Sequence, residues 1–145
     1  MQRFFALKTA WCLFALCALS PRAAANDGEE TALLIINDIT IRVEVARTQE
    51  QRRVGLSGRD TCRADAGMLF VFQPPRKACL WMKDTKIPLQ AFFLDFKGGV
   101  INAVKMRPFS KEIHCTTAKA GYALEVNDGL FNEISDDMTV RGLPE

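Results

Sequence analysis

The sequence contains a single histidine, His114, and this scarcity limits the chemistry open to the protein. Zinc centres draw on several imidazole, thiolate or carboxylate ligands, and no second nitrogen ligand is available. His114 adjoins Cys115, but neighbours in an extended segment point to opposite sides, so a ready cysteine–histidine pair is not expected. The sequence also lacks a phosphate-binding glycine loop. The glycines within residues 97–99 have the composition of a hairpin turn instead. We therefore expect neither a metal nor a cofactor.

Only the N-terminus has an apolar run with the features of a targeting segment. The basic residues Arg3 and Lys8 precede ten apolar residues at positions 10–19, and small residues for cleavage follow at 23–25. This order is typical of a secretory signal peptide and is too short for a stable membrane span. A retained N-terminal anchor is the alternative. The sequence predicts a signal peptide over residues 1–25, a disordered linker over 26–31 and one domain over 32–145, located in the periplasm or outside the cell.

The charge of the chain changes with that processing. Residues 1–25 hold three basic residues and no acidic one, so their removal leaves 16 basic and 17 acidic residues and changes the net charge from +2 to −1. A domain without a basic field is not expected to bind nucleic acid or to insert stably into a membrane. We expect a monomer or weak oligomer whose partner is a small molecule or an envelope component.

The cysteine count is odd once the predicted signal peptide is gone. Cys12 and Cys17 leave with it, and Cys62, Cys79 and Cys115 remain. Their spacing matches no zinc or redox motif. An oxidising compartment permits one bridge and one free thiol, or three plain thiols. Because Cys62 and Cys115 both lie in irregular segments, the predicted bridge is Cys62–Cys115.

Short strands dominate the expected fold. Residues 39–45 and 122–126 alternate between apolar and polar side chains, as half-buried strands do. Residues 67–72 and 89–96 are short apolar runs, typical of strands buried on both faces. Thr48 has the position of a helix N-cap before a short helix. The sequence predicts a mainly β protein (α+β at most): a single compact antiparallel β barrel or sandwich with one or two short helices.

A polar-aromatic block, Trp81–Thr85, separates the two apolar runs and marks the candidate site. Trp81 either anchors the core or forms the wall of a ligand site. The candidate ligand-binding side chains belong to this block, to the arginine-rich segment before it and to two strands after it. They are Arg52, Arg59, Trp81, Lys83, Asp84, Thr85, Asp95 and Glu125.

The charged candidates have two interpretations each. Arg52 and Arg59 form a solvated face or contact an anion, which suits a guanidinium fork. Asp84, Asp95 and Glu125 either form salt bridges or meet in one cavity for acid–base chemistry. Glu125 lies on the opposite face of its strand from its apolar neighbours, so it is solvated or lines a cleft.

Several motifs, in this order and spacing, resemble the prokaryotic domain of unknown function 192 family. They span about residues 40–140: Arg52 with Gly55-Leu56 and Arg59, Gly67–Phe72, Trp81–Thr85, Ile87-Pro88-Leu89, Phe93 with Asp95, and Tyr122 with Leu124-Glu125 and Gly129. The resemblance implies a compact, mostly β, often exported domain and no established activity. Members usually carry Asp where this chain has Gln90, and Gly-Asp where it has Asp136-Asp137. If that Asp contributes to a family site, its contribution is absent here.

Three functions remain open at this point. The favoured one is an exported binding or accessory module for a small ligand or an envelope component. The alternatives are a hydrolase- or isomerase-like enzyme that uses Asp84 and Glu125, and a purely structural envelope protein. A pocket walled by Trp81 favours the first two, and a shifted carboxyl pKa inside it favours the enzyme.

Overall fold

The computed structural model describes residues 30–133, 135 and 137–145 of the chain. The predicted signal peptide and most of the predicted linker lie outside these residues. The last linker residue, Thr31, already belongs to the first strand, so the ordered domain begins one residue earlier than predicted.

Seven of the strands in the described part form one sheet, in the order β6-β5-β8-β3-β2-β1-β9. Two further strands, β4 and β7, pair with each other in a separate ribbon. The elements in chain order are β1 (Thr31–Ile36), β2 (Ile39–Ala46), α1 (Gln49–Val54), β3 (Ala66–Arg76), β4 (Cys79–Leu80), β5 (Leu89–Leu94), β6 (Val100–Met106), β7 (His114–Cys115), β8 (Ala120–Asn127) and β9 (Val140–Arg141). The mainly β prediction is confirmed. The predicted antiparallel arrangement of the strands has one exception, the pair β2 and β3, which runs parallel.

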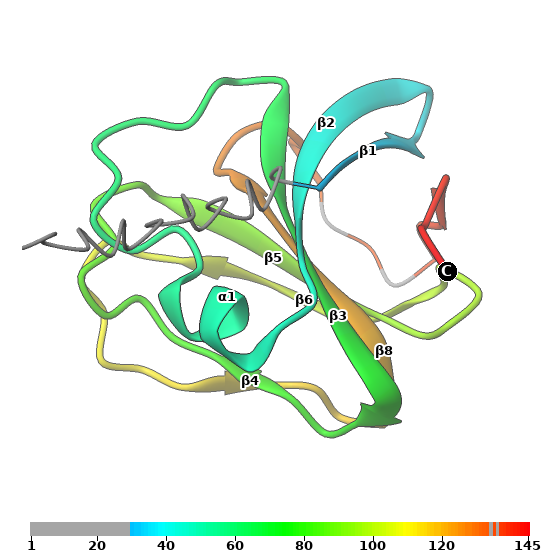
Figure 1. Cartoon of the computed structure of the whole chain (residues 1–145). Helices are drawn as coiled ribbons and strands as arrows, with labels where there is room; N and C mark the ends of the chain where they lie inside the picture. The colour runs from blue at the N-terminus through cyan, green and yellow to red at the C-terminus, as the bar shows by residue number, and fades with distance from the viewer. Residues whose placement is uncertain (1–29, 134, 136) are drawn as a thin grey trace, which may run out of the picture.

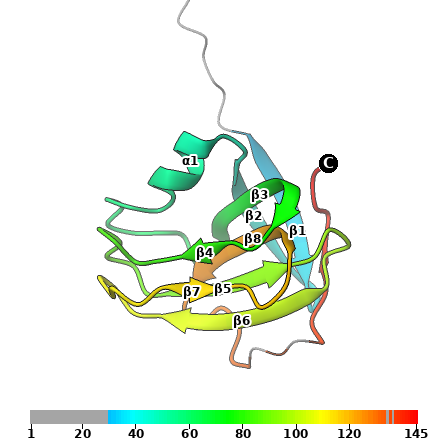
Figure 2. The ribbon, with the colours of Figure 1, turned by 90° about the horizontal axis from the view of Figure 1, so that it is seen from below.

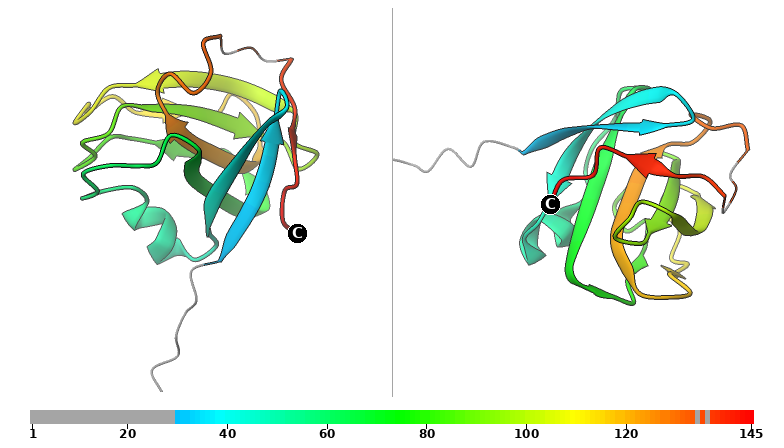
Figure 3. Two further views of the ribbon diagram at one scale, coloured as in Figure 1. Left: turned by 90° about the horizontal axis from the view of Figure 1, so that it is seen from above. Right: turned by 90° about the vertical axis from the view of Figure 1, so that its right-hand side faces the viewer.

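The sheet curls into a half-barrel (Figure 1). The edge strand β9 lies beside β1, as Figure 3 shows, and pairs with it through Ile35–Arg141 and Ile36–Val140. On its other side, Thr139 bridges to Gly99 at the start of β6. These contacts connect the two edges of the sheet at one end, which removes part of the open edge that a sheet otherwise presents.

Both faces of the central strands are buried, each in its own apolar cluster. The inner cluster fills the half-barrel and includes Leu34, Ile36, Ile41, Val43, Leu69, Val71, Phe92, Leu94, Tyr122, Leu124, Val126 and Phe131. The outer cluster lies on the other face and includes Leu56, Met68, Phe70, Phe72, Leu80, Met82, Ile87, Leu89, Ala91, Phe93, Met106 and Ala123. Alternate residues of β3, β5 and β8 enter one cluster or the other, as the two-residue period of a strand requires.

The loop after α1 and a two-stranded ribbon contribute Leu56 and Leu80 to the outer cluster, and α1 lies next to them. Thr48 caps α1 by accepting a hydrogen bond from the Gln51 backbone, and the Gln51 side chain accepts one from the Thr48 backbone in return. This reciprocal capping box determines where the short helix begins. Figure 2 shows α1 next to the ribbon formed by β4 and β7.

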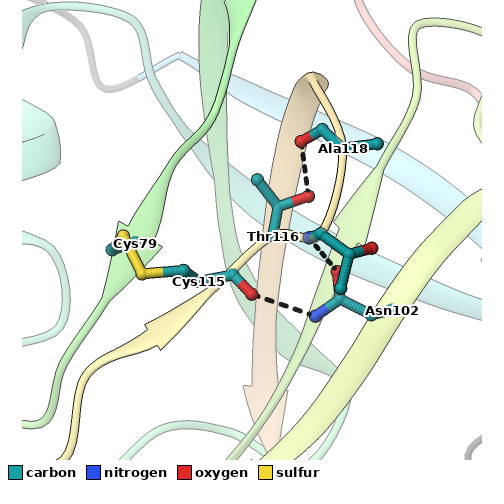
Figure 4. The surroundings of a disulfide bond; sticks show 6 residues. Cys79, Asn102, Cys115, Thr116 and Ala118 are labelled. Carbon is teal, nitrogen blue, oxygen red and sulfur yellow. Dashed lines mark hydrogen bonds between the residues drawn. A yellow bond between two sulfur atoms is a disulfide. The ribbon is translucent and has the colours of Figure 1, made fainter.

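The ribbon carries the disulfide, which joins Cys79 to Cys115 (Figure 4). The predicted Cys62–Cys115 bridge is therefore wrong. Cys79 and Cys115 lie directly opposite each other in the β4–β7 ladder, a proximity that only the pairing of these strands creates. Cys62 keeps a free, half-buried thiol. Asn102 of β6 holds the ribbon in place, since its amide donates to the Cys115 carbonyl over 3.4 Å and accepts from Thr117 over 3.1 Å.

Candidate functional site

Glu125 is a carboxyl group placed in the outer apolar cluster. It lies in the middle of β8 with Met68 of β3 opposite it on one side and Ala91 of β5 on the other. Only 5 % of the residue is exposed. No hydrogen bond or ion pair to its carboxyl group is found among the described residues. Burial alone raises the pKa of Glu125 to about 8, because an apolar environment disfavours the charged form.

A cavity of about 110 Å³ opens onto this carboxyl group, and we call it the Glu125 cavity. Its walls come from α1 and the loop after it, from β3, and from the segment around β4. The lining residues are Arg52, Arg53, Val54, Gly55, Leu56, Ser57, Phe70, Cys79, Leu80, Trp81, Thr85 and Glu125. The alternation of β8 predicted the face on which Glu125 lies, but burial among apolar residues excludes the solvated interpretation.

The loop that carries Trp81 and Thr85 is tied to the loop after α1. The Ser57 hydroxyl donates to the Lys83 carbonyl over 2.9 Å, and the Gly58 N–H donates to the Asp84 carbonyl over 2.8 Å. Thr85 is buried, and its hydroxyl donates to the Lys83 carbonyl. Trp81 is 53 % exposed, so it does not anchor the core and instead forms part of the cavity wall.

A second, larger cavity of about 360 Å³ adjoins the first, and its polar lining is basic. We call it the arginine groove. It is lined by Gln49, Arg52, Arg53, Phe70, Phe72, Arg76, Lys77, Ala78, Cys79 and Leu80. Several of these residues, Arg52 among them, also line the Glu125 cavity.

Two guanidinium groups converge on one aromatic ring in this groove. The Cζ atoms of Arg52 and Arg76 lie 6.0 and 5.1 Å from the centroid of Phe72. Arg52 donates to the carbonyl oxygens of Val71 and Arg47, and its Nε has no partner. Burial and the charge of Arg76 lower the pKa of Arg52. Within the described part of the chain, no carboxylate pairs with either arginine.

Sequence reasoning missed Arg76 and Phe72. Residues 73–76 extend β3 past its buried part, and this extension places Arg76 over the ring of Phe72. The adjacent basic pair Arg76-Lys77 after two prolines was the only available signal, because convergence on Arg52 depends on the distant helix.

The remaining predicted site residues lie elsewhere. Arg59 pairs through both terminal nitrogens with the carboxylate of Glu44. Asp95 accepts hydrogen bonds from the Lys97 and Gly99 backbone over 2.7 and 3.0 Å, which stabilises the β5–β6 turn. Its role there is structural.

Lys83 and Asp84 line a separate apolar hollow of about 450 Å³ with Trp81 and Phe109, and the Lys83 ammonium lies 5.6 Å from the Trp81 ring. Asp84 and Glu125 therefore line different cavities, with Trp81 as the shared wall. This separation does not support a mechanism in which the two carboxyl groups act on one substrate.

Gln90 has a structural role in this chain. Its side chain is fully buried on the inner face of β5, opposite to the Glu125 face. The amide nitrogen donates to the Phe131 carbonyl over 2.6 Å, and the amide oxygen accepts from the Phe131 N–H over 3.2 Å. An amide satisfies both backbone groups, which a carboxylate cannot do, so Gln90 fixes the loop that follows β8.

The described residues contain neither a metal-ligand cluster nor a membrane-spanning helix. Within residues 30–133, 135 and 137–145, no three His, Cys, Asp or Glu side chains come together as a metal site would require. No helix in this part of the chain combines the length and the apolar character needed to cross a bilayer.

The fold and its cavities define a mainly β half-barrel domain with a covered outer face. Residues 32–141 match the domain of unknown function 192 family, described as Uncharacterized ACR, and the chain belongs to this family. The chain is 30% identical to a Sinorhizobium meliloti 1021 protein provisionally described as a transcription regulator, with a TM-score of 0.71 over 78% of this chain and 92% of that one.

A second similar structure is a protein of unknown function from Novosphingobium aromaticivorans DSM 12444. It is 26% identical, with a TM-score of 0.74 over 86% of this chain and 94% of that one. A comparison with the curated proteins gives no match. The similar structures thus support the fold.

Proposed function

We propose that this protein is an exported module that binds a small anionic ligand, of the carboxylate class, in the arginine groove. The observation that carries the proposal is the convergence of Arg52 and Arg76 on Phe72 without a carboxylate partner in the described residues. Arg52 is half-buried, and its burial and the positive charge of Arg76 lower the pKa of Arg52, so an anion bound beside both groups relieves their repulsion. The groove volume lies within the range of roughly 300–1,000 Å³ typical of small-molecule sites.

The other basic residues of the groove differ in how far their charge is available. Arg53 is neutralised by Glu50, which it contacts over 2.6 Å. Lys77 is exposed and adds positive charge near Arg76. A planar carboxylate fits the guanidinium fork in a bidentate manner, so we assign the main ligand contacts to Arg52 and Arg76.

Export is the second part of the proposal. The Cys79–Cys115 disulfide supports it, because disulfides form and persist mainly in oxidising compartments. The signal-like features of residues 1–25 agree with it. Nucleic acid is not proposed as the ligand. The predicted mature chain has a net charge of −1, and the six-residue α1 is too short to act as a recognition helix in a groove of DNA.

Titration calorimetry with citrate and with inorganic pyrophosphate tests the binding function. We expect citrate to bind, and Arg76→Gln to weaken binding about tenfold or more, since a hydrogen bond to a charged group contributes roughly 1.5–3 kcal/mol. Arg141→Gln, on the far edge strand β9, is the matched control and should bind as the wild type does. If pyrophosphate binds more tightly than citrate, the ligand belongs to the phosphate class. If neither anion binds, or if Arg76→Gln changes nothing, the proposed function is wrong.

A further inference from the structure

The Glu125 cavity holds a carboxyl group that the anion-binding function does not use. The residues directly beside Glu125 in the sheet, Met68 and Ala91, are apolar and offer it no hydrogen bond. A buried polar group without a partner costs free energy, and proteins keep such groups mainly where they serve a ligand or a reaction. The carboxyl group faces a cavity, so a ligand group that enters the cavity can supply the missing partner.

Glu125 is a neutral acid at neutral pH. Its pKa of about 8 follows from burial, and no opposite charge acts to lower it. The other ionisable side chains that line the cavity are Arg52 and Arg53 of α1, and neither forms an ion pair with Glu125. β3, β5 and the segment around β4 contribute no titratable group to this cavity, since Cys79 is held in the disulfide. A neutral carboxyl group offers one O–H donor and one C=O acceptor side by side.

An amide presents the complementary pair, a C=O acceptor and an N–H donor. The cavity volume of about 110 Å³ corresponds to roughly three or four waters at about 30 Å³ each, which is room for an acetamide-sized group. The lining is mainly polar, and Phe70, Leu80 and Trp81 supply an apolar part of it that can contact the acyl carbons. Arg52 lines both cavities, so a carboxylate in the arginine groove and a group in the Glu125 cavity can belong to one small molecule.

We propose that the Glu125 cavity is an amide-binding subsite, in which Glu125 donates its carboxyl O–H to the amide carbonyl of the ligand and accepts from the amide N–H. This inference rests on the anion-binding function proposed above, and it specifies the ligand as a carboxylate-bearing N-acyl compound, of the N-acylated amino acid type.

N-Acetylglycine is the smallest probe with both groups, and levulinate is its matched control. Levulinate replaces the N–H by CH₂ and keeps the carbonyl and the carboxylate. In ligand-observed NMR titrations we expect N-acetylglycine to bind at least about tenfold more tightly, the effect of one hydrogen bond of about 1.4 kcal/mol. Its affinity should be constant from weakly acidic to neutral pH and should fall as the pH rises through about 8, because the carboxylate form has no proton to donate.

Two variants separate a ligand contact from a structural role. Glu125→Gln keeps a donor and an acceptor at every pH, so it should bind N-acetylglycine without the pH dependence of the wild type. Glu125→Leu has neither group and should lose the preference for N-acetylglycine over levulinate. If Glu125→Leu does not fold, the pH series of the wild type and of Glu125→Gln decides the question.

Equal binding of the two probes, or a wild-type pH profile that Glu125→Gln leaves unchanged, overturns the amide subsite. The anion-binding function still stands in that case if Arg76→Gln weakens both probes. If neither probe binds, the amide subsite is overturned, and the citrate titration decides whether the anion-binding function stands. If Arg76→Gln affects the binding of neither probe nor that of citrate, both proposals are overturned.

Discussion

Met68 of β3 lies directly opposite Glu125 of β8, so the residue across this strand pair offers the buried carboxyl group neither a charge nor a strong hydrogen bond. An Arg or Lys at position 68 would have turned Glu125 into half of a buried ion pair. With methionine there, the group stays protonated at pH values where an exposed glutamate is fully ionised. The pH dependence of stability and the chemistry of the cavity both depend on this protonated carboxyl group.

Glu125→Gln should stabilise the protein at neutral and alkaline pH. The pKa of Glu125 is raised in the folded state, so its neutral form contributes stability that is fully present below the unfolded value of 4.5. That stability falls as the pH rises above 4.5 and is lost by the time the pH passes about 8. We expect wild type and variant to be similar near pH 4 and to differ by several kcal/mol near pH 8. Urea denaturation at a series of pH values measures the difference.

Glu133→Gln is the control for this series, because Glu133 is exposed. It should follow the wild type at all pH values. A Glu125→Gln curve that runs parallel to the wild type would mean that Glu125 is ionised in the folded protein.

Removing the disulfide should destabilise the domain by about 4 kcal/mol at most. The bridge closes a loop with a sequence separation of 36 residues, and the chain-entropy model assigns a stabilisation of this order to such a loop. Chemical denaturation of the double variant Cys79→Ser, Cys115→Ser measures the loss. Cys62→Ser is the matched control and should change stability by less than about 0.5–1 kcal/mol, since serine keeps the size of the side chain and, among the described residues, the Cys62 thiol makes one long hydrogen bond, to the Ala66 carbonyl.

Gln90→Leu should destabilise the protein even though leucine is apolar and of similar size. The substitution leaves the N–H and the C=O of Phe131 buried without partners, and each lost partner costs roughly 1–3 kcal/mol. We expect a total loss of about 2–6 kcal/mol in urea denaturation. Gln49→Leu, at an exposed position of α1, should be nearly neutral. A Gln90→Leu variant as stable as the wild type would show that water reaches Phe131.

The exported protein should begin at Asn26, because the small residues at 23–25 provide the cleavage site. Intact-mass measurement of the protein recovered from the periplasm or medium decides this. Thiol counting on the same sample, denatured and not reduced, should give one free thiol, that of Cys62. A mass that retains residues 1–25 would identify the segment as an anchor, and Cys12 and Cys17 would add to the count.

The sequence by itself determined the local features of this protein. The alternation of Tyr122, Leu124 and Val126 against Glu125 placed that carboxyl group on the outer face of β8, because a strand turns successive side chains to opposite faces. Thr48 predicted the start of α1, since capping involves only residues within one turn. The family was recognisable too, from motifs spread over the domain.

Only the tertiary structure decided which distant segments meet. The parallel pairing of β2 with β3, the bridge between Cys79 and Cys115, and the convergence of Arg52 with Arg76 all join residues that local patterns leave unrelated. For the same reason the burial of Glu125 could not be predicted. A strand's alternation states which face a side chain occupies, but whether water reaches that face depends on the elements packed over it, here α1 and the segment around β4.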